Sequence, residues 1–121
     1  MDLLAGNWGL NTRLSASYSQ PLKIYLKDFD NNGKEEAIVT LFHDGVETVF
    51  SSKTDLAKQM PSINKKFLTY KTFAQASIEE LFGAEHLRSA DQKQVFMLKH
   101  CVFLNAGKEG FKPVILPYET Q

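Results

Sequence analysis

The residues best suited to chemistry are acidic and amide side chains that alternate along residues 28–36. Asp28, Asp30 and Asn32 occupy the first, third and fifth places of this stretch, and Gly33 occupies the sixth. Oxygen ligands at alternate places, followed by a glycine that permits a sharp turn, are what a hard cation such as calcium requires of a tight loop. The spacing therefore predicts a cation-binding loop.

The later places of the same stretch extend the predicted ligand shell. Lys34, at place seven, would offer its carbonyl oxygen, and Glu36, at place nine, would close the shell directly or through water. Place twelve, which holds a glutamate in an EF-hand, is Val39 here, and the flanking segments look like strands. We therefore expect a strand–loop–strand calcium site in place of an EF-hand, with a dissociation constant of about 10⁻⁴ to 10⁻³ M.

A polar hairpin turn is the alternative interpretation of these residues, because Asp, Asn and Gly are common in turns for conformational reasons. That interpretation leaves one cost unexplained. Four carboxylates crowd a single turn, and only Lys27 and Lys34 are near enough to offset their charge. We therefore favour the metal-binding interpretation.

Other reactive pairs are weaker candidates. His100 and Cys101 suggest a thiol–imidazole dyad, but adjacent residues of a strand point to opposite faces, so their side chains should not meet. Asp28 and Asp30 could form the carboxylate pair of a hydrolase, but no second catalytic group marks a pocket beside them. We therefore expect the protein not to be an enzyme.

Strand-like segments flank the loop and must position it. Residues 22–26 alternate apolar and polar side chains, which is typical of a strand with one buried face. Residues 37–42 are almost entirely apolar, which is typical of a strand covered on both faces. The Asp44-Gly45 dipeptide that follows is a strong hairpin signal, so residues 47–50 should return as a third antiparallel strand.

A helical pattern replaces the strands over residues 53–89. Ser52 with Asp55, and Ser77 with Glu80, resemble helix-capping pairs, in which a serine oxygen accepts from the free amides of the first turn. We therefore expect several short helices with a break near Ser77, inserted between the third and fourth strands.

Two further β-like segments follow the helices. Residues 95–104 form the longest apolar run and are predicted as one strand, and residues 111–116 are predicted as a last strand, which Pro113 places at an edge. Residues 1–121 are predicted to form a single domain with an α+β fold. It consists of one antiparallel sheet of about five strands within residues 22–50 and 95–116, with the helical insertion at residues 53–89.

Composition limits the classes of partner. The chain has 121 residues and a formal net charge of zero, so it lacks the basic surface that follows a nucleic-acid backbone. No apolar run approaches the length of a membrane span, and no signal peptide is visible. Residues 2–6 begin abruptly, like the tail of a strand, so we expect a piece of a longer protein whose export signal lies elsewhere.

Three segments resemble a known family. Residues 26–39, Leu-Lys-Asp-Phe-Asp-Asn-Asn-Gly-Lys-Glu-Glu-Ala-Ile-Val, resemble the FG-GAP/VCBS repeat, whose core runs strand, Asp-x-Asp-x-Asx-Gly loop, strand. Residues 102–107, followed by Gly110 and Phe111, resemble the apolar strand, Asn-x-Gly turn and following phenylalanine of that family. Residues 2–7 resemble the end of a preceding repeat, and the helical segment resembles an insertion in repeat proteins of gut Bacteroidetes.

The resemblance implies a β-propeller blade, or part of one, that binds calcium in its loop. The implied ligands are Asp28, Asp30, Asn32, the carbonyl of Lys34, and Glu36. The family also implies an exported protein, extracellular, at the cell surface or periplasmic, that acts in adhesion, glycan handling or scaffolding. Its implied partners are neighbouring repeats of the parent chain and a protein or glycan ligand. The unpaired edges of an isolated blade would favour self-association.

Two hypotheses about function follow from these observations. The first is a non-enzymatic, calcium-binding repeat unit in which the ion rigidifies the loop and neutralises its carboxylates. The alternative is a carbohydrate- or protein-binding module in which the helical insertion is the recognition surface and the acidic loop is only a turn.

Overall fold

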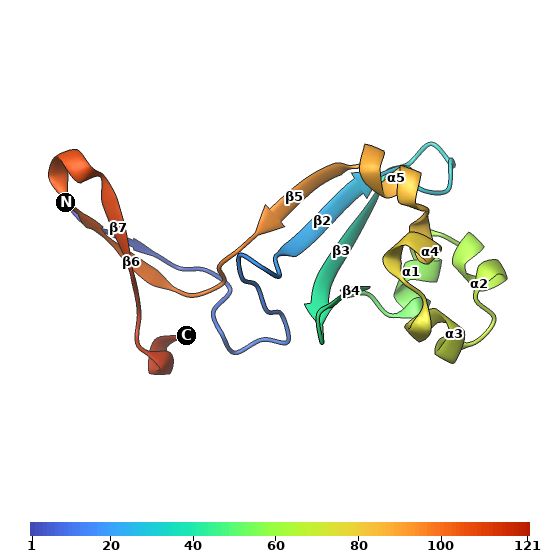
Figure 1. Cartoon of the computed structure of the whole chain (residues 1–121), viewed down its shortest axis with the longest axis horizontal. Coiled ribbons are helices and arrows are strands. Elements are labelled where there is room, and N and C mark those ends of the chain that lie inside the picture. Colours follow the sequence, from blue (N-terminus) through green and yellow to red (C-terminus); the bar gives the residue numbers. More distant parts are fainter.

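Two antiparallel sheets and five short helices make up the computed structural model, which describes residues 1–121 (Figure 1). The strands are β1 (Leu3–Ala5), β2 (Leu22–Lys27), β3 (Glu36–His43), β4 (Val46–Val49), β5 (Asp91–Val95), β6 (Cys101–Asn105) and β7 (Phe111–Ile115). One sheet has four strands in the order β4-β3-β2-β5, and the other has three in the order β1-β6-β7. The fold class is α+β, as predicted, but the single sheet of about five strands is wrong.

The second sheet exists because the predicted strand over residues 95–104 is broken. Strand β5 ends at Val95, where it pairs with β2, and β6 begins at Cys101, where it pairs with β1. Between them the backbone bonds to a loop near the N-terminus. The carbonyl of Met97 accepts from the Asn7 side-chain amide (2.8 Å), and the carbonyl of Leu98 accepts from the Gly9 N–H (2.7 Å). The apolar run therefore supplies one strand to each sheet.

Two turns fix the register of the four-stranded sheet. Lys27 pairs with Glu36, so the acidic loop joins β2 directly to β3. His43 pairs with Val46, and the Asp44-Gly45 turn between them has positive φ at both residues, 49° and 80°. That is the geometry of a type I′ hairpin. The structure thus confirms the hairpin and the third antiparallel strand.

The helices lie between residues 53 and 89, the range that the sequence pattern indicated. They are α1 (Lys53–Gln59), α2 (Ser62–Lys66), α3 (Tyr70–Gln75), α4 (Ile78–Phe82) and α5 (Ala84–Ser89), and 3₁₀ turns follow at Gly107–Glu109 and Tyr118–Thr120. Ser52 caps α1, and Ser77 with Glu80 forms a complete capping box at α4, which confirms the break. Each helix is too short or too polar to cross a bilayer.

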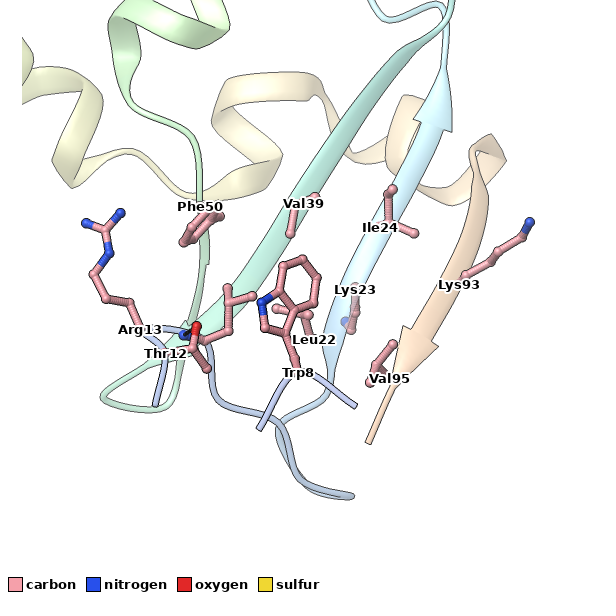
Figure 2. Close-up of a pocket in the computed structure, with 11 residues that line it drawn as sticks. Trp8, Thr12, Arg13, Leu22, Lys23, Ile24, Val39, Phe50, Lys93 and Val95 are labelled. Atoms are coloured by element: carbon pink, nitrogen blue, oxygen red, sulfur yellow. Dashed lines mark hydrogen bonds between the residues drawn. The ribbon is translucent and has the colours of Figure 1, made fainter. Parts of the chain in front are cut away.

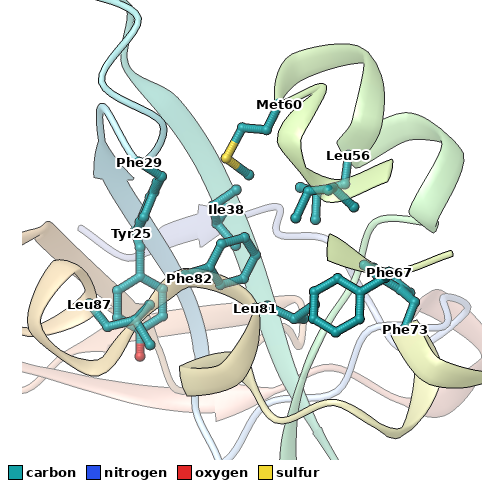
Figure 3. Packing of buried hydrophobic residues seen from close by; sticks show 11 residues of the cluster. Tyr25, Phe29, Ile38, Leu56, Met60, Phe67, Phe73, Leu81, Phe82 and Leu87 are labelled. Atoms are coloured by element: carbon teal, nitrogen blue, oxygen red, sulfur yellow. The ribbon is translucent and has the colours of Figure 1, made fainter. Parts of the chain in front are cut away.

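The helices are stabilised by burial against one face of the four-stranded sheet. Helices of five to seven residues are marginal on their own in water, so tertiary packing must hold them. Tyr25 and Ile38, paired across β2 and β3, are 5% and 1% exposed and form the sheet side of the core. Figure 3 shows how the helical side chains close over them. The core cluster consists of Tyr25, Phe29, Ile38, Leu56, Met60, Ile63, Phe67, Phe73, Leu81, Phe82 and Leu87.

Truncation of one core leucine tests this packing. Leu56 is 1% exposed and lies in α1, so Leu56→Ala should lower the free energy of unfolding by about 2–5 kcal/mol. Leu68 lies between α2 and α3 and is 84% exposed, so Leu68→Ala is the matched control and should change stability by less than about 0.5 kcal/mol. Urea unfolding followed by circular dichroism measures both. Equal effects of the two changes would contradict the packing.

Candidate metal centre

The acidic loop, residues 28–35, connects β2 to β3 at the end of the sheet that lies beside α5 (Figure 1). Two residues give it a tight course. Asn31 and Gly33 have φ of 57° and 86°, which is the left-handed region, where asparagine and glycine are favoured. Gly33, at place six, thus adopts the positive φ that the predicted sharp turn requires.

Side-chain oxygens of the loop accept hydrogen bonds from its own backbone. Asp28 accepts the N–H of Asn32 through Oδ1 (3.0 Å) and the N–H of Gly33 through Oδ2 (2.8 Å). Asp30 Oδ1 accepts the same Asn32 N–H at 3.2 Å, and Asn32 Oδ1 accepts the N–H of Lys34 at 2.9 Å. These bonds turn the alternate side chains toward the inside of the loop.

Three of the five predicted ligands come together. Asp28, Asp30 and Glu36 each offer a carboxylate oxygen, and the three oxygens lie within 4.8 Å of one another. Calcium binds oxygen at about 2.3–2.6 Å, so oxygens on opposite sides of one ion stand at most about 5 Å apart. The cluster is therefore compact enough for a single calcium ion. The assignments of Asn32 and of the Lys34 carbonyl stay predictions.

Glu36 is the most buried member of the cluster. Its residue is 4% exposed, and its Oε2 accepts the N–H of Phe29 at 2.8 Å. Lys27 is its register partner across the ladder, but no lysine or arginine forms an ion pair with any carboxylate of this loop. A buried carboxylate with one neutral donor carries a desolvation cost. A divalent cation is one group that could offset that cost.

Phe29 attaches the loop to the helices. It is 8% exposed, its ring centroid lies 5.3 Å from that of Phe82 in α4, and it lies 6.4 Å from the ring of His86 in α5. No pattern in the sequence predicted a role for Phe29. The signal was a large apolar side chain at place two, between two acidic residues of an otherwise polar loop.

His100 and Cys101 have separate contacts, but the reason predicted for this is wrong, because His100 precedes β6 and does not lie in a strand. The Nδ1 atom of His100 accepts the backbone N–H of Asn7 at 2.7 Å, and Cys101 is 3% exposed. No hydrogen bond joins the two side chains. The imidazole instead helps to fix the loop that bonds to the broken strand.

Comparison of the chain with models of known protein families, with curated proteins and with solved structures found no match. The resemblance to the FG-GAP/VCBS repeat therefore stays an expectation based on the three segments that carry it. The assignment of a function depends on the geometry of the chain's own residues.

A second polar group, which the sequence analysis missed, surrounds Glu47 of β4. Its carboxylate accepts from Lys23 Nζ (2.8 Å), Tyr25 Oη (3.0 Å) and Thr40 Oγ1 (2.6 Å). Burial lowers the pKa of Lys23, but the hydrogen bond and charge of Glu47 outweigh burial and raise it above its ordinary 10.5. Burial, then the hydrogen bond and charge of Glu47, raise the pKa of Tyr25 above 10.0. With every donor satisfied by one carboxylate, the network is structural.

These raised pKa values predict a loss of stability at alkaline pH. A group with a higher pKa in the folded state contributes stability that is fully present below its unfolded pKa and is lost as the pH rises through the folded pKa. The free energy of unfolding should therefore fall as the pH rises above about 10, the unfolded pKa of tyrosine, and it should fall less in Tyr25→Phe.

Urea unfolding at several pH values measures this dependence. Tyr118 is 81% exposed, so Tyr118→Phe is the matched control and should follow the wild-type profile. A Tyr25→Phe profile as steep as that of wild type would contradict the role assigned to the tyrosine hydroxyl.

Proposed function

We propose that the chain is a non-enzymatic, calcium-binding repeat unit of an exported or cell-surface protein. The observation that carries this proposal is the convergence of Asp28, Asp30 and Glu36, whose carboxylate oxygens lie within 4.8 Å of one another. The ion would take these three oxygens, with Asn32 and the Lys34 carbonyl completing the shell. A loop of this charge suits the millimolar range of calcium that extracellular modules use.

Calcium would act on structure rather than on a reaction. It would neutralise carboxylates that have no ion-pair partner and would fix the turn between β2 and β3. Because Phe29 in the same loop packs against Phe82 and His86, binding would also stabilise the helical core. The expected effect of calcium binding is a more stable repeat unit, not the assembly of a catalytic centre.

Exposed apolar surface on the three-stranded sheet supports the role of a repeat unit. Strand β7 is exposed throughout, with Phe111, Val114 and Ile115 at 50%, 47% and 49%, and Leu4 of β1 is 75% exposed. The register places Leu4 and Val114 on one face of this sheet and Phe111 and Ile115 on the other, so apolar side chains are exposed on both faces. Exposed apolar surface of this kind is typical of an interaction face. Neighbouring repeats of a parent chain would cover it, and an isolated unit would self-associate through it and through its open strand edges.

Thermal unfolding tests the calcium proposal. With a dissociation constant of about 10⁻⁴ to 10⁻³ M, 10 mM calcium should stabilise the fold by about 1.4–2.7 kcal/mol. For a chain of this size, the melting temperature should rise by about 5–10 °C relative to the same protein in EDTA. Asp28→Ala should lose most of that rise, because it removes a ligand carboxylate.

Glu35→Gln is the matched control. It removes one negative charge from the same loop, but Glu35 is exposed and lies outside the carboxylate cluster, so it should keep most of the calcium-dependent rise. A wild-type melting temperature that is equal in calcium and in EDTA would exclude the calcium function. An equal loss in Asp28→Ala and Glu35→Gln would point to general charge screening.

We infer a second candidate function, carbohydrate binding by the helical insertion, from a polar cavity of about 350 Å³ beside Tyr70. Tyr70 is 68% exposed, and its hydroxyl lies 2.9 Å from Thr54 Oγ1. Lys53 lies 5.5 Å from the Tyr70 ring and donates to Asn64 at 2.8 Å. An aromatic ring bordered by hydroxyl, amide and ammonium groups suits a sugar, which presents both apolar and hydroxyl surface.

A glycan array tests this second candidate. Wild type should bind at least one glycan, and Tyr70→Ala should bind it at least about tenfold more weakly, because the stacking surface is lost. Tyr118→Ala removes an exposed tyrosine far along the chain from this cavity and should bind as wild type does. An array without binding would exclude the carbohydrate function.

A further inference from the structure

The face of the four-stranded sheet opposite the helices carries an apolar cavity of about 430 Å³ (Figure 2). Because side chains alternate along a strand, the residues next to the core pair Tyr25 and Ile38 must point to this second face. Ile24 and Val39 do so, and they pair with each other across the ladder. The sheet side of the cavity consists of Leu22, Ile24, Val39 and Val95, with Phe50 at one edge and Trp8 over the opening.

Trp8 is held in place by hydrogen bonds on both sides of it. The Asn7 N–H donates to His100 Nδ1 at 2.7 Å, and the Gly9 N–H donates to the carbonyl of Leu98, also at 2.7 Å. Gly9 has φ of 79°, and a Cβ there would lie 2.9 Å from His100 Nε2. The indole is nevertheless 67% exposed. The backbone on both sides of Trp8 is therefore fixed, and the indole stands at the opening of the cavity with one side exposed to solvent.

The charges around the cavity are all positive. Its lining includes Arg13, Lys23 and Lys93, and no aspartate or glutamate. The Lys23 ammonium lies on the helix side of the sheet with Tyr25, where it pairs with Glu47 at 2.8 Å. The charged groups of the cavity itself are therefore those of Arg13 and Lys93, which form no ion pair. In Figure 2 these two side chains lie on opposite sides of the cavity, with their charged ends directed outward. An anionic group at the rim would find a cationic partner, and a cationic group would find none.

Arg13 is the better placed of the two cations. Its guanidinium lies 5.8 Å from the centroid of the Phe50 ring, so it sits at the aromatic edge of the cavity. A guanidinium offers two parallel donors that match the two oxygens of a carboxylate. Lys93 contributes its alkyl stem to the lining and a point charge at the far rim.

We propose that this cavity binds a small apolar carboxylate. The hydrocarbon part lies against Ile24, Val39 and Trp8, and the carboxylate pairs with Arg13. The size fits, because ligand cavities typically measure about 300–1,000 Å³ and are largely apolar with a few polar groups that orient the ligand. The site is separate from the calcium loop, which lies at the other end of β2 and β3, so neither proposal depends on the other.

Decanoate is a suitable probe, and the chain reports on it directly. Trp8 is the only tryptophan of the sequence, so its fluorescence reads out this cavity alone. Titration in EDTA, below the concentration at which decanoate forms micelles, should give a saturable change. Arg13→Gln should weaken binding about tenfold, because it removes a charge-assisted hydrogen bond. Decanol has the same hydrocarbon chain but no charge. Wild type should therefore bind decanol about tenfold more weakly than it binds decanoate.

Two controls separate this site from general adsorption. Lys71→Gln removes an exposed cation from α3, outside the cavity, and should bind as wild type does. Val39→Phe fills the cavity and should abolish saturation while the protein stays folded by circular dichroism; if that variant does not fold, Arg13→Gln decides alone. Absence of saturation in wild type, or equal affinities of wild type and Arg13→Gln, would overturn the proposal. So would a concentration-dependent dimer that shields Trp8 without ligand.

Discussion

The insertion of Phe29 into the helical core is the constraint on which the acidic loop depends. With that ring packed against Phe82 and His86, the carboxylates on either side of it must turn away from the core. The Phe29 N–H then donates to Glu36, which brings the third carboxylate under the loop. Packing of Phe29 and clustering of the carboxylates thus come from the same short segment of the loop.

The local features of this fold could be predicted from the sequence because short-range chemistry determines them. The Asp44-Gly45 hairpin and the Ser77 capping box each depend on a few neighbouring residues. The division into two sheets could not be predicted in this way. It depends on contacts such as that between Asn7 and Met97, which lie 90 residues apart in sequence, and no pattern within residues 95–104 indicates where the strand is interrupted.

The candidate site shows the same division: its local spacing could be predicted from the sequence, but its long-range contacts could not. Alternate spacing indicated that Asp28, Asp30 and Glu36 would converge, and they do. The role of Glu47 was not visible, because its partners Lys23 and Thr40 come from two other strands and meet it only once the register is set. Strands β2 and β3 thus contribute to three regions of the molecule. They carry a polar network and the core on one face, an apolar cavity on the other face, and a cluster of carboxylates at one end.

The position of the outer strands β1 and β7 determines how the chain would respond to mechanical tension. Both run antiparallel to β6 and lie on either side of it, so they point in the same direction. A pull on the start of β1 and on the end of β7 would slide the strands past β6 and load the bonds of both ladders together. Force would pass through this small sheet alone. The helices, the acidic loop and the apolar cavity belong to the bypassed segment and would stay unloaded until β6 gave way.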